Sequence, residues 1–240
     1  ELLRYLAAVV SLRMGLKNKV HAVLTKNGIE CSFSSVLGKK SRQWLRTLSV
    51  RDCYRRELEG YIRLAELSTA LIQEVTTRIK EVVSVTPQAQ LLMTVPGTSY
   101  YSALLILSEI GQIHRFVSAK HLCSYAGLVP SLYSSGSKSF HGRITKQGSR
   151  WLRWIAVEIS IHAANGDAAF QNLYRRICRR RGLATAKVAV ARKILTVIYA
   201  MLKTNQPFRR RRPRQQILAK AWSKKNKESS GHPPGVMIQA

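Results

Sequence analysis

Apolar side chains recur at steps of three and four residues through the segment 51–88, and half of all the carboxylates of the chain lie there. Alternation of these two steps is the heptad pattern of a helix that packs along a seam. Opposite charges four residues apart, such as Glu59 and Arg63, support the outer face of such a helix. We therefore predict one long coiled-coil helix in 51–88. The seam positions are Leu58, Tyr61, Ala65, Ser68, Ile72, Val75, Ile79 and Val82.

A similar apolar stripe runs through residues 2–26, and Asn27-Gly28 then supplies a helix stop. Residues 29–50 indicate a connector with one short basic helix near Trp44. We interpret 1–50 as connecting helices. A stripe of this kind needs a partner, so the arm is either an antiparallel pair within the chain or a dimeric coiled coil.

Shorter helices are predicted from residue 89 to residue 206. Pro96-Gly97 lies between two apolar segments, which predicts a helix-hairpin-helix-like element whose helix N-terminus faces a phosphate. Gly97 is accordingly a candidate nucleic-acid-binding residue. Ser99 stands where such hairpins usually have a second glycine, and an ordinary turn between two helices is the alternative.

Further helices of this domain are placed by their caps. Ser118 and Ser149 are expected to cap helices that follow them, and Gly182 is expected to end a helix that begins near Phe170. A last long helix is predicted over about 184–203. The segment 207–240 is rich in Arg, then Lys, and is expected to be a basic disordered tail. The predicted fold class is all-α.

The net charge of the chain indicates the class of its binding partner. Its 240 residues include 40 Lys and Arg against 12 Asp and Glu, which gives a formal net charge of +28. Nucleic acid is the expected partner of such an excess, with a ribosomal or nucleoid structural protein as the alternative. No uncharged apolar segment is long enough for a membrane span, and four dispersed cysteines indicate reduced thiols. We expect a cytoplasmic protein of the bacterial cytosol or nucleoid, without a membrane partner.

Candidate chemistry is confined to a serine-glycine turn. Carboxylates outside 51–100 share no metal-ligand spacing, and His114, His121 and Cys123 are better explained by an ordinary helix face, so no metal site is predicted. Ser135 stands directly before Gly136, and cationic residues follow that could hold a phosphate and stabilise the charge of a transition state. Those cations are Arg143, Lys146, Arg150 and Arg153. A plain polar turn is the alternative, because a free serine is a weak nucleophile.

Residues 89–205 resemble a known domain in the order and spacing of their motifs. The matching pieces are residues 92–97, 116–130, Ser135-Gly136, residues 143–148, residues 150–153 and the final helix through Pro207-Phe208. They resemble the C-terminal transposase domain of insertion-sequence transposases of the bridge-RNA-guided type. In that family a RuvC-like domain with four acidic residues precedes this domain.

The resemblance implies that Ser135 attacks a DNA phosphodiester and forms a covalent phosphoserine link. It also implies homo-oligomers, a guide RNA, and Mg²⁺ in the RuvC-like domain alone. This sequence starts after the last acidic motif, so an N-terminally truncated transposase fragment is expected, with no cofactor of its own. The alternative is a non-catalytic, nucleic-acid-binding remnant of a transposase, and whether the chain alone is an enzyme stays open.

Overall fold

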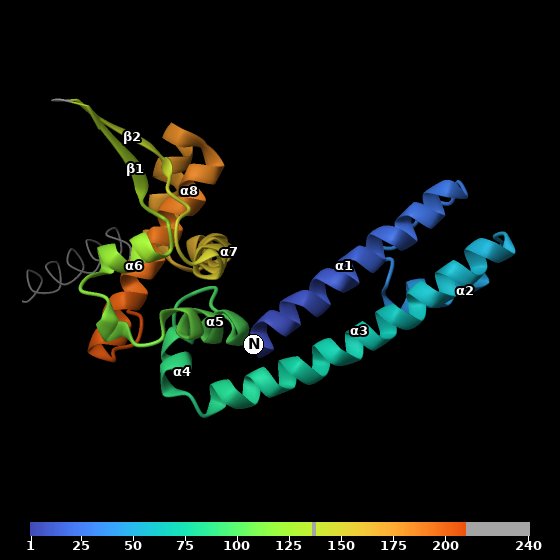
Figure 1. Cartoon of the computed structure of the whole chain (residues 1–240). Coiled ribbons are helices and arrows are strands. Elements are labelled where there is room, and N and C mark those ends of the chain that lie inside the picture. The colour runs from blue at the N-terminus through green and yellow to red at the C-terminus, as the bar shows by residue number, and fades with distance from the viewer. Residues whose placement is uncertain (136–137, 210–240) are drawn as a thin grey trace, which may run out of the picture. The chain divides into compact units, whose positions relative to one another are not determined.

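The computed structural model describes residues 1–135 and 138–209. The chain divides into two compact units, Glu1–Pro87 and the residues from Gln88 onward (Figure 1). Each unit has its own core. The predicted all-α class is confirmed, because the described residues form helices and only one two-stranded sheet.

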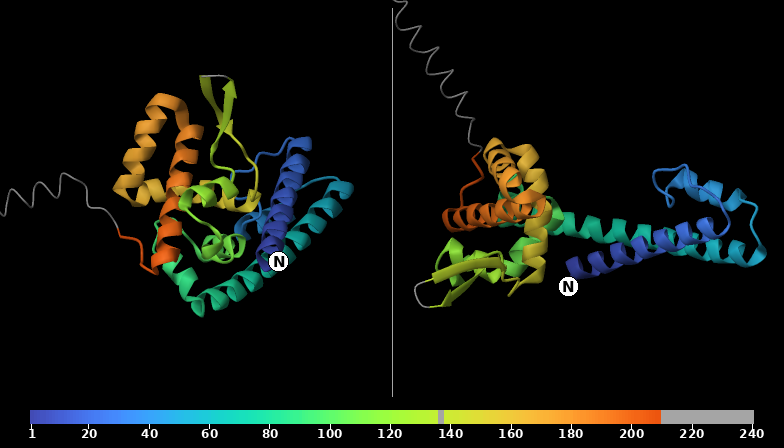
Figure 2. Two further views of the ribbon diagram at one scale, coloured as in Figure 1. Left: turned by 60° about the vertical axis from the view of Figure 1, so that its left-hand side comes forward. Right: turned by 90° about the horizontal axis from the view of Figure 1, so that it is seen from above.

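Unit 1 is built on two long helices, α1 (Leu2–Lys26) and α3 (Asp52–Ser84), which run side by side in opposite directions (Figures 1 and 2). The predicted long helix is present, and α1 covers its apolar seam within the same chain. Most of the predicted seam positions are buried, although Ile62 and Val83 take the buried places expected for Tyr61 and Val82. The shift follows from the helical repeat of 3.6 residues, which drifts away from a strict heptad.

Ser68 is the polar member of this seam and is almost fully buried. Its hydroxyl donates a hydrogen bond of 2.7 Å to the carbonyl of Leu64, so its burial leaves no polar atom unsatisfied. The short basic helix near Trp44 is also confirmed as α2 (Lys39–Thr47), which buries Leu45 against α3. Coiled-coil pairing with a second copy stays a prediction.

Unit 2 contains the remaining helices and the sheet. The helices are α4 (Pro87–Met93), α5 (Tyr100–Ile110), the 3-10 turn η1 (Ile113–Arg115), α6 (Ala119–Tyr125), α7 (Arg150–Gly166) and α8 (Ala168–Thr204). The second half of α8 forms the centre of the core, where its buried face packs against α6 and α7. That face consists of Ala186, Val190, Ala191, Ile194, Leu195 and Ile198.

A single residue joins α7 to α8. Asp167 ends α7, and its carboxylate accepts hydrogen bonds from the backbone N–H groups of Ala169 and Phe170 at the start of α8. Farther along, Gly182 has φ 81° and ψ 171°, so α8 consists of two helical segments joined at a kink. The predicted helix end at Gly182 is therefore correct, and the next segment continues from it directly.

The sequence predicted a serine-glycine turn around Ser135 and no strand, but the residues on either side of that turn form a β-hairpin. Strand β1 (Pro130–Ser135) pairs antiparallel with β2 (Lys138–Ile144) and carries the pairs Leu132 with His141 and Tyr133 with Phe140. The hairpin projects from the helices of unit 2 (Figures 1 and 2). Its large apolar side chains are exposed. Leu132 and Tyr133 are adjacent, so the sequence lacks the alternation of apolar and polar residues that predicts a strand.

Candidate nucleic-acid interface

The base of the β-hairpin is fixed to the helical core by backbone contacts. The N–H groups of Thr145 and Lys146 donate to the carbonyls of Val129 and Gly127, at 2.9 and 3.2 Å. Gly127 and Gly148 both have positive φ, and a Cβ atom on either would collide with a backbone carbonyl oxygen, of Gln147 and Tyr125 respectively. Only glycine fits at these two positions, where two backbone segments lie in contact. The base of the hairpin is therefore a closely packed junction.

Ser135 is the last described residue of β1 and pairs with Lys138 at the far end of the hairpin. Arg143 belongs to the base, where its carbonyl accepts a hydrogen bond from the Ser131 hydroxyl at 3.0 Å. Ser135 lies four residue steps along the strand from Ser131, which is about 13 Å at the rise of a β-strand. The candidate nucleophile and the nearest candidate cation of the base are therefore not brought together within the described hairpin. Gly136, the neighbour of Ser135, lies outside the described residues.

Arg143 and Lys146 line a groove of about 680 Å³ between the hairpin base and α8. The opposite wall adds Arg181 and Arg192 from α8, and all four cationic side chains are exposed. We call this the hairpin–α8 groove. It brings two predicted site residues together with two that sequence analysis missed. Thr185, Val188, Ala189 and Arg192 share one helix face by their spacing, which was the available indication.

The two arginines of α7 differ in their contacts. Arg150 is the first residue of the helix and is exposed. Arg153 is half-buried and donates from its guanidinium to the carbonyl of Ala126 at 3.0 Å, which ties α7 to the end of α6. Arg153 therefore has a structural contact besides any role in binding, whereas Arg150 is open to a partner.

The N-terminus of α7 already has an anionic neighbour. Ser149 caps the helix as predicted, accepting a hydrogen bond from the N–H of Leu152 at 3.0 Å. The same hydroxyl donates to the carboxylate of Glu109 at 2.7 Å. A carboxylate at this position interacts favourably with the helix dipole and competes with a phosphate for it.

The turn at Gly97 packs against α7. Gly97 has φ +83°, and a Cβ atom there would lie 2.6 Å from the Cβ of His162. Ser99 caps α5, and it forms a reciprocal capping box with Ser102. The glycine is thus required by close helix packing, and its contact with a phosphate stays a prediction.

The three residues considered for a metal site lie in separate environments. His114 Nδ1 is 3.2 Å from Lys203 Nζ, and His121 Nδ1 is 2.9 Å from the hydroxyl of Ser118, which caps α6 by its backbone only. Cys123 is buried against α8, and this burial raises the pKa of its thiol. In residues 1–135 and 138–209 no group of three or more His, Cys, Asp or Glu side chains could hold a metal ion. These residues do not fit a metal site.

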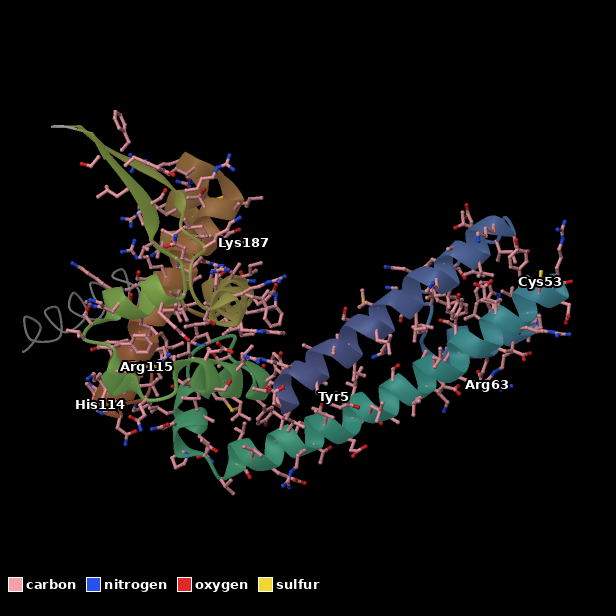
Figure 3. All side chains as sticks on the ribbon, in the orientation of Figure 1. Tyr5, Cys53, Arg63, His114, Arg115 and Lys187 are labelled. Carbon is pink, nitrogen blue, oxygen red and sulfur yellow. The ribbon has the colours of Figure 1, made fainter. Side chains whose placement is uncertain are left out.

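None of the helices described is long and apolar enough to cross a membrane. The cations of unit 2 are distributed over more than one end of it. Figure 3 shows His114 and Arg115 at the end of the unit away from the hairpin. The groove is therefore a local cluster of positive charge within a generally basic unit.

Comparison with known proteins shows which proteins this basic helical unit resembles. Residues 89–175, which include the hairpin and α7, match the model of the family described as "Transposase IS116/IS110/IS902 family". The transposase for insertion sequence element IS1111A of Coxiella burnetii is 30% identical over 135 residues, 55% of this chain and 37% of that protein. The pilin gene-inverting protein of Moraxella bovis is 34% identical over 149 residues, 58% of this chain and 46% of that protein.

A third relative is similar over more of the chain. The mini-circle putative transposase for IS117 of Streptomyces coelicolor is 25% identical over 219 residues, 89% of this chain and 51% of that protein. The chain spans less than half the length of the first two relatives. Residues 89–175 are thus similar to the transposase domain of the IS116/IS110/IS902 family.

Proposed function

We propose that this chain supplies the strand-cleaving and strand-joining part of a DNA transposase, with Ser135 as the nucleophile. The observation that carries the proposal is the family match, because residues 89–175 contain both strands of the β-hairpin and the whole of α7. The hairpin presents the Ser135 position away from the packed core, where a DNA backbone can reach it.

The proposed chemistry is an exchange of phosphodiesters. The Ser135 oxygen bonds to phosphorus, the bond from phosphorus to one sugar oxygen breaks, and the serine proton passes to that leaving oxygen. Attack by a free sugar hydroxyl on the phosphoserine reverses the same steps and rejoins a strand. The energy of the broken bond is kept in the phosphoserine, so no ATP is required. A serine hydroxyl needs an activating group for this attack, and the described residues of the hairpin base do not provide one nearby.

DNA is the proposed substrate, held by Gly97, Gly136, Arg143, Lys146, Arg150 and Arg153. Arg143, Lys146 and Arg150 are exposed and are free of the packing role of Arg153. Cationic contacts of this kind bind the backbone of any sequence and weaken as salt is added. The overall charge of +28 supports the same partner.

Three further elements of the proposal extend beyond this chain. A guide RNA is a second polyanionic partner, and homo-oligomers form through the helices of unit 1. Mg²⁺ is expected in an acidic domain of the full-length relatives, and no step above is routed through it. The protein acts in the bacterial cytosol or nucleoid.

The test uses the chain with end-labelled DNA that carries a nick next to the cleavage site, so that a covalent adduct cannot reverse. We expect a protein–DNA adduct that survives denaturing electrophoresis, and its loss in Ser135→Ala. Ser134→Ala is the matched control, since Ser134 is the preceding residue of the same strand and is exposed. An undiminished adduct in Ser135→Ala would assign the nucleophile to another residue. DNA binding should be nearly the same in all three proteins.

A second function is favoured by one observation, the separation of about 13 Å between the Ser135 position and the level of Arg143 along the strand. A chain whose candidate cations at the hairpin base lie away from the Ser135 position can bind nucleic acid without cleaving it. This non-catalytic form of the transposase predicts salt-dependent binding and no adduct in either the unsubstituted chain or its variants.

A further inference from the structure

The hairpin–α8 groove combines residues that are remote in sequence. Its cations come from β2, from the segment after β2, and from both helical segments of α8: Arg143, Lys146, Arg181 and Arg192. Among the residues that the structure describes, no acidic side chain lines it. Four positive charges around one cavity repel each other, and this repulsion is relieved when an anion is bound between them.

The groove is also lined by apolar side chains, several of them small. On α8 it presents small side chains, among them Ala184 and Ala189, and on the hairpin side it presents Leu128 and Ile144. The side chains of Ala184 and Ala189 are short, so a ligand can lie close to the backbone of α8. The groove therefore offers an apolar surface for sugars and base edges, and cations around it for phosphates.

The size of the groove limits the form of the ligand. A cavity of about 680 Å³ is in the range of small-molecule sites, which hold roughly 300–1,000 Å³. A strand of nucleotides fits such a space, whereas a double helix is far wider and touches only its rim. Backbone recognition in a positively charged groove is the usual way in which single strands are bound without sequence preference.

We propose that the hairpin–α8 groove binds the backbone of single-stranded nucleic acid, with Arg181 and Arg192 as phosphate-binding residues beside Arg143 and Lys146. The inference rests on the proposed function only in taking nucleic acid as the partner. It adds two residues outside the set of cations expected from the sequence, and it specifies an unpaired strand. DNA and RNA share the phosphodiester backbone, so both are ligands of the groove.

The first experiment removes two charges at the groove and compares them with two charges elsewhere. Fluorescence anisotropy measures binding of the full chain to labelled oligothymidylate, to oligouridylate and to a DNA duplex. Arg181→Ala with Arg192→Ala should weaken single-strand binding about tenfold and lower the salt slope by about 1.4, or 0.7 for each lost phosphate contact. Both side chains are exposed, so the fold should persist.

The matched control is Lys120→Ala with Lys203→Ala, which removes the same charge from exposed positions that do not line the groove. Lys203 contacts His114, which lies at the end of unit 2 away from the hairpin (Figure 3). We expect this control to weaken binding of single strands by less than about threefold. An equal loss in the two double variants would contradict a binding role for the groove. Binding would then be due to the positive charge of the whole surface. An equal or larger loss with the duplex would overturn the preference for a single strand.

The second experiment fills the groove without changing its charge. Ala184→Trp places a large side chain on the floor, whereas Leu183→Trp adds the same ring at an exposed neighbour that does not line the groove. Single-strand binding should fall several-fold in Ala184→Trp only. Unchanged binding in Ala184→Trp would contradict occupancy of the groove.

The two proposals fail in different ways. If the unsubstituted chain binds neither DNA nor RNA, the proposed function fails together with this inference. If it binds single strands and the groove variants bind them equally well, the groove inference alone is wrong. Equal results with oligothymidylate and oligouridylate support recognition of the shared backbone, and a loss confined to one of them assigns the groove to that nucleic acid.

Discussion

The two antiparallel pairs of this molecule, α1 with α3 and β1 with β2, are held together in opposite ways. The helical pair buries an apolar seam along its length, from Leu58 to Val83 on α3. The β-hairpin exposes its large apolar side chains, with Leu132 60%, Tyr133 66% and Phe140 62% accessible. Its strands are joined by backbone hydrogen bonds, and its position is fixed at the base alone. The buried seam makes the helical pair a scaffold, whereas the exposed side chains of the hairpin form a surface that is available to a partner.

The largest expected effect comes from breaking the helical pair. Leu58 is fully buried on α3, so Leu58→Ala leaves a cavity in the seam of unit 1. We expect a loss of about 2–5 kcal/mol in the free energy of unfolding, measured by urea denaturation followed by circular dichroism. Leu64→Ala is the control on the exposed face of the same helix and should cost less than about 1 kcal/mol. Similar losses in both variants would show that the seam is not the scaffold.

A smaller effect is expected at the base of the hairpin. Gly148 has φ +88° and lies against the carbonyl of Tyr125, so Gly148→Ala strains the backbone and forces the junction apart. Strain of this kind costs about 1–3 kcal/mol. Because the junction positions the hairpin, single-strand binding at the groove should fall along with stability.

Gly15→Ala is the control for this change, because Gly15 lies within α1 and has open space around its Cβ position. That variant should be neutral or slightly stabilising, since alanine favours a helix. A Gly148→Ala protein with unchanged stability would mean that the base of the hairpin is not tightly packed.

The smallest effect on stability is expected along the hairpin itself. Tyr133→Ser changes an exposed side chain on β1 and should alter the free energy of unfolding by no more than about 0.5 kcal/mol. If the hairpin presents a surface, the same variant should weaken nucleic-acid binding measured by anisotropy. A stability loss as large as that of Leu58→Ala would remove the contrast between the two pairs.

The same contrast explains how far the sequence predicted the structure. The long helix α3 was predictable because its apolar spacing repeats over many turns, and Ser149 was recognisable as a cap from its position before an apolar helix. The hairpin was missed because Leu132 and Tyr133 are adjacent, so the sequence does not alternate between apolar and polar residues there. Arg181 and Arg192 joined the candidate site only through the packing of α8 against the hairpin base.

The kink of α8 at Gly182 has a stereochemical consequence. Its φ of 81° with ψ of 171° belongs to a region that L-residues avoid, yet a Cβ atom built there meets no other atom within 4 Å. At Gly97, Gly127 and Gly148, by contrast, both the positive φ and the lack of space exclude a side chain. At Gly182 the restriction concerns handedness alone. This backbone conformation is one that D-residues favour, whereas L-alanine would oppose the turn that carries Arg181 toward the groove.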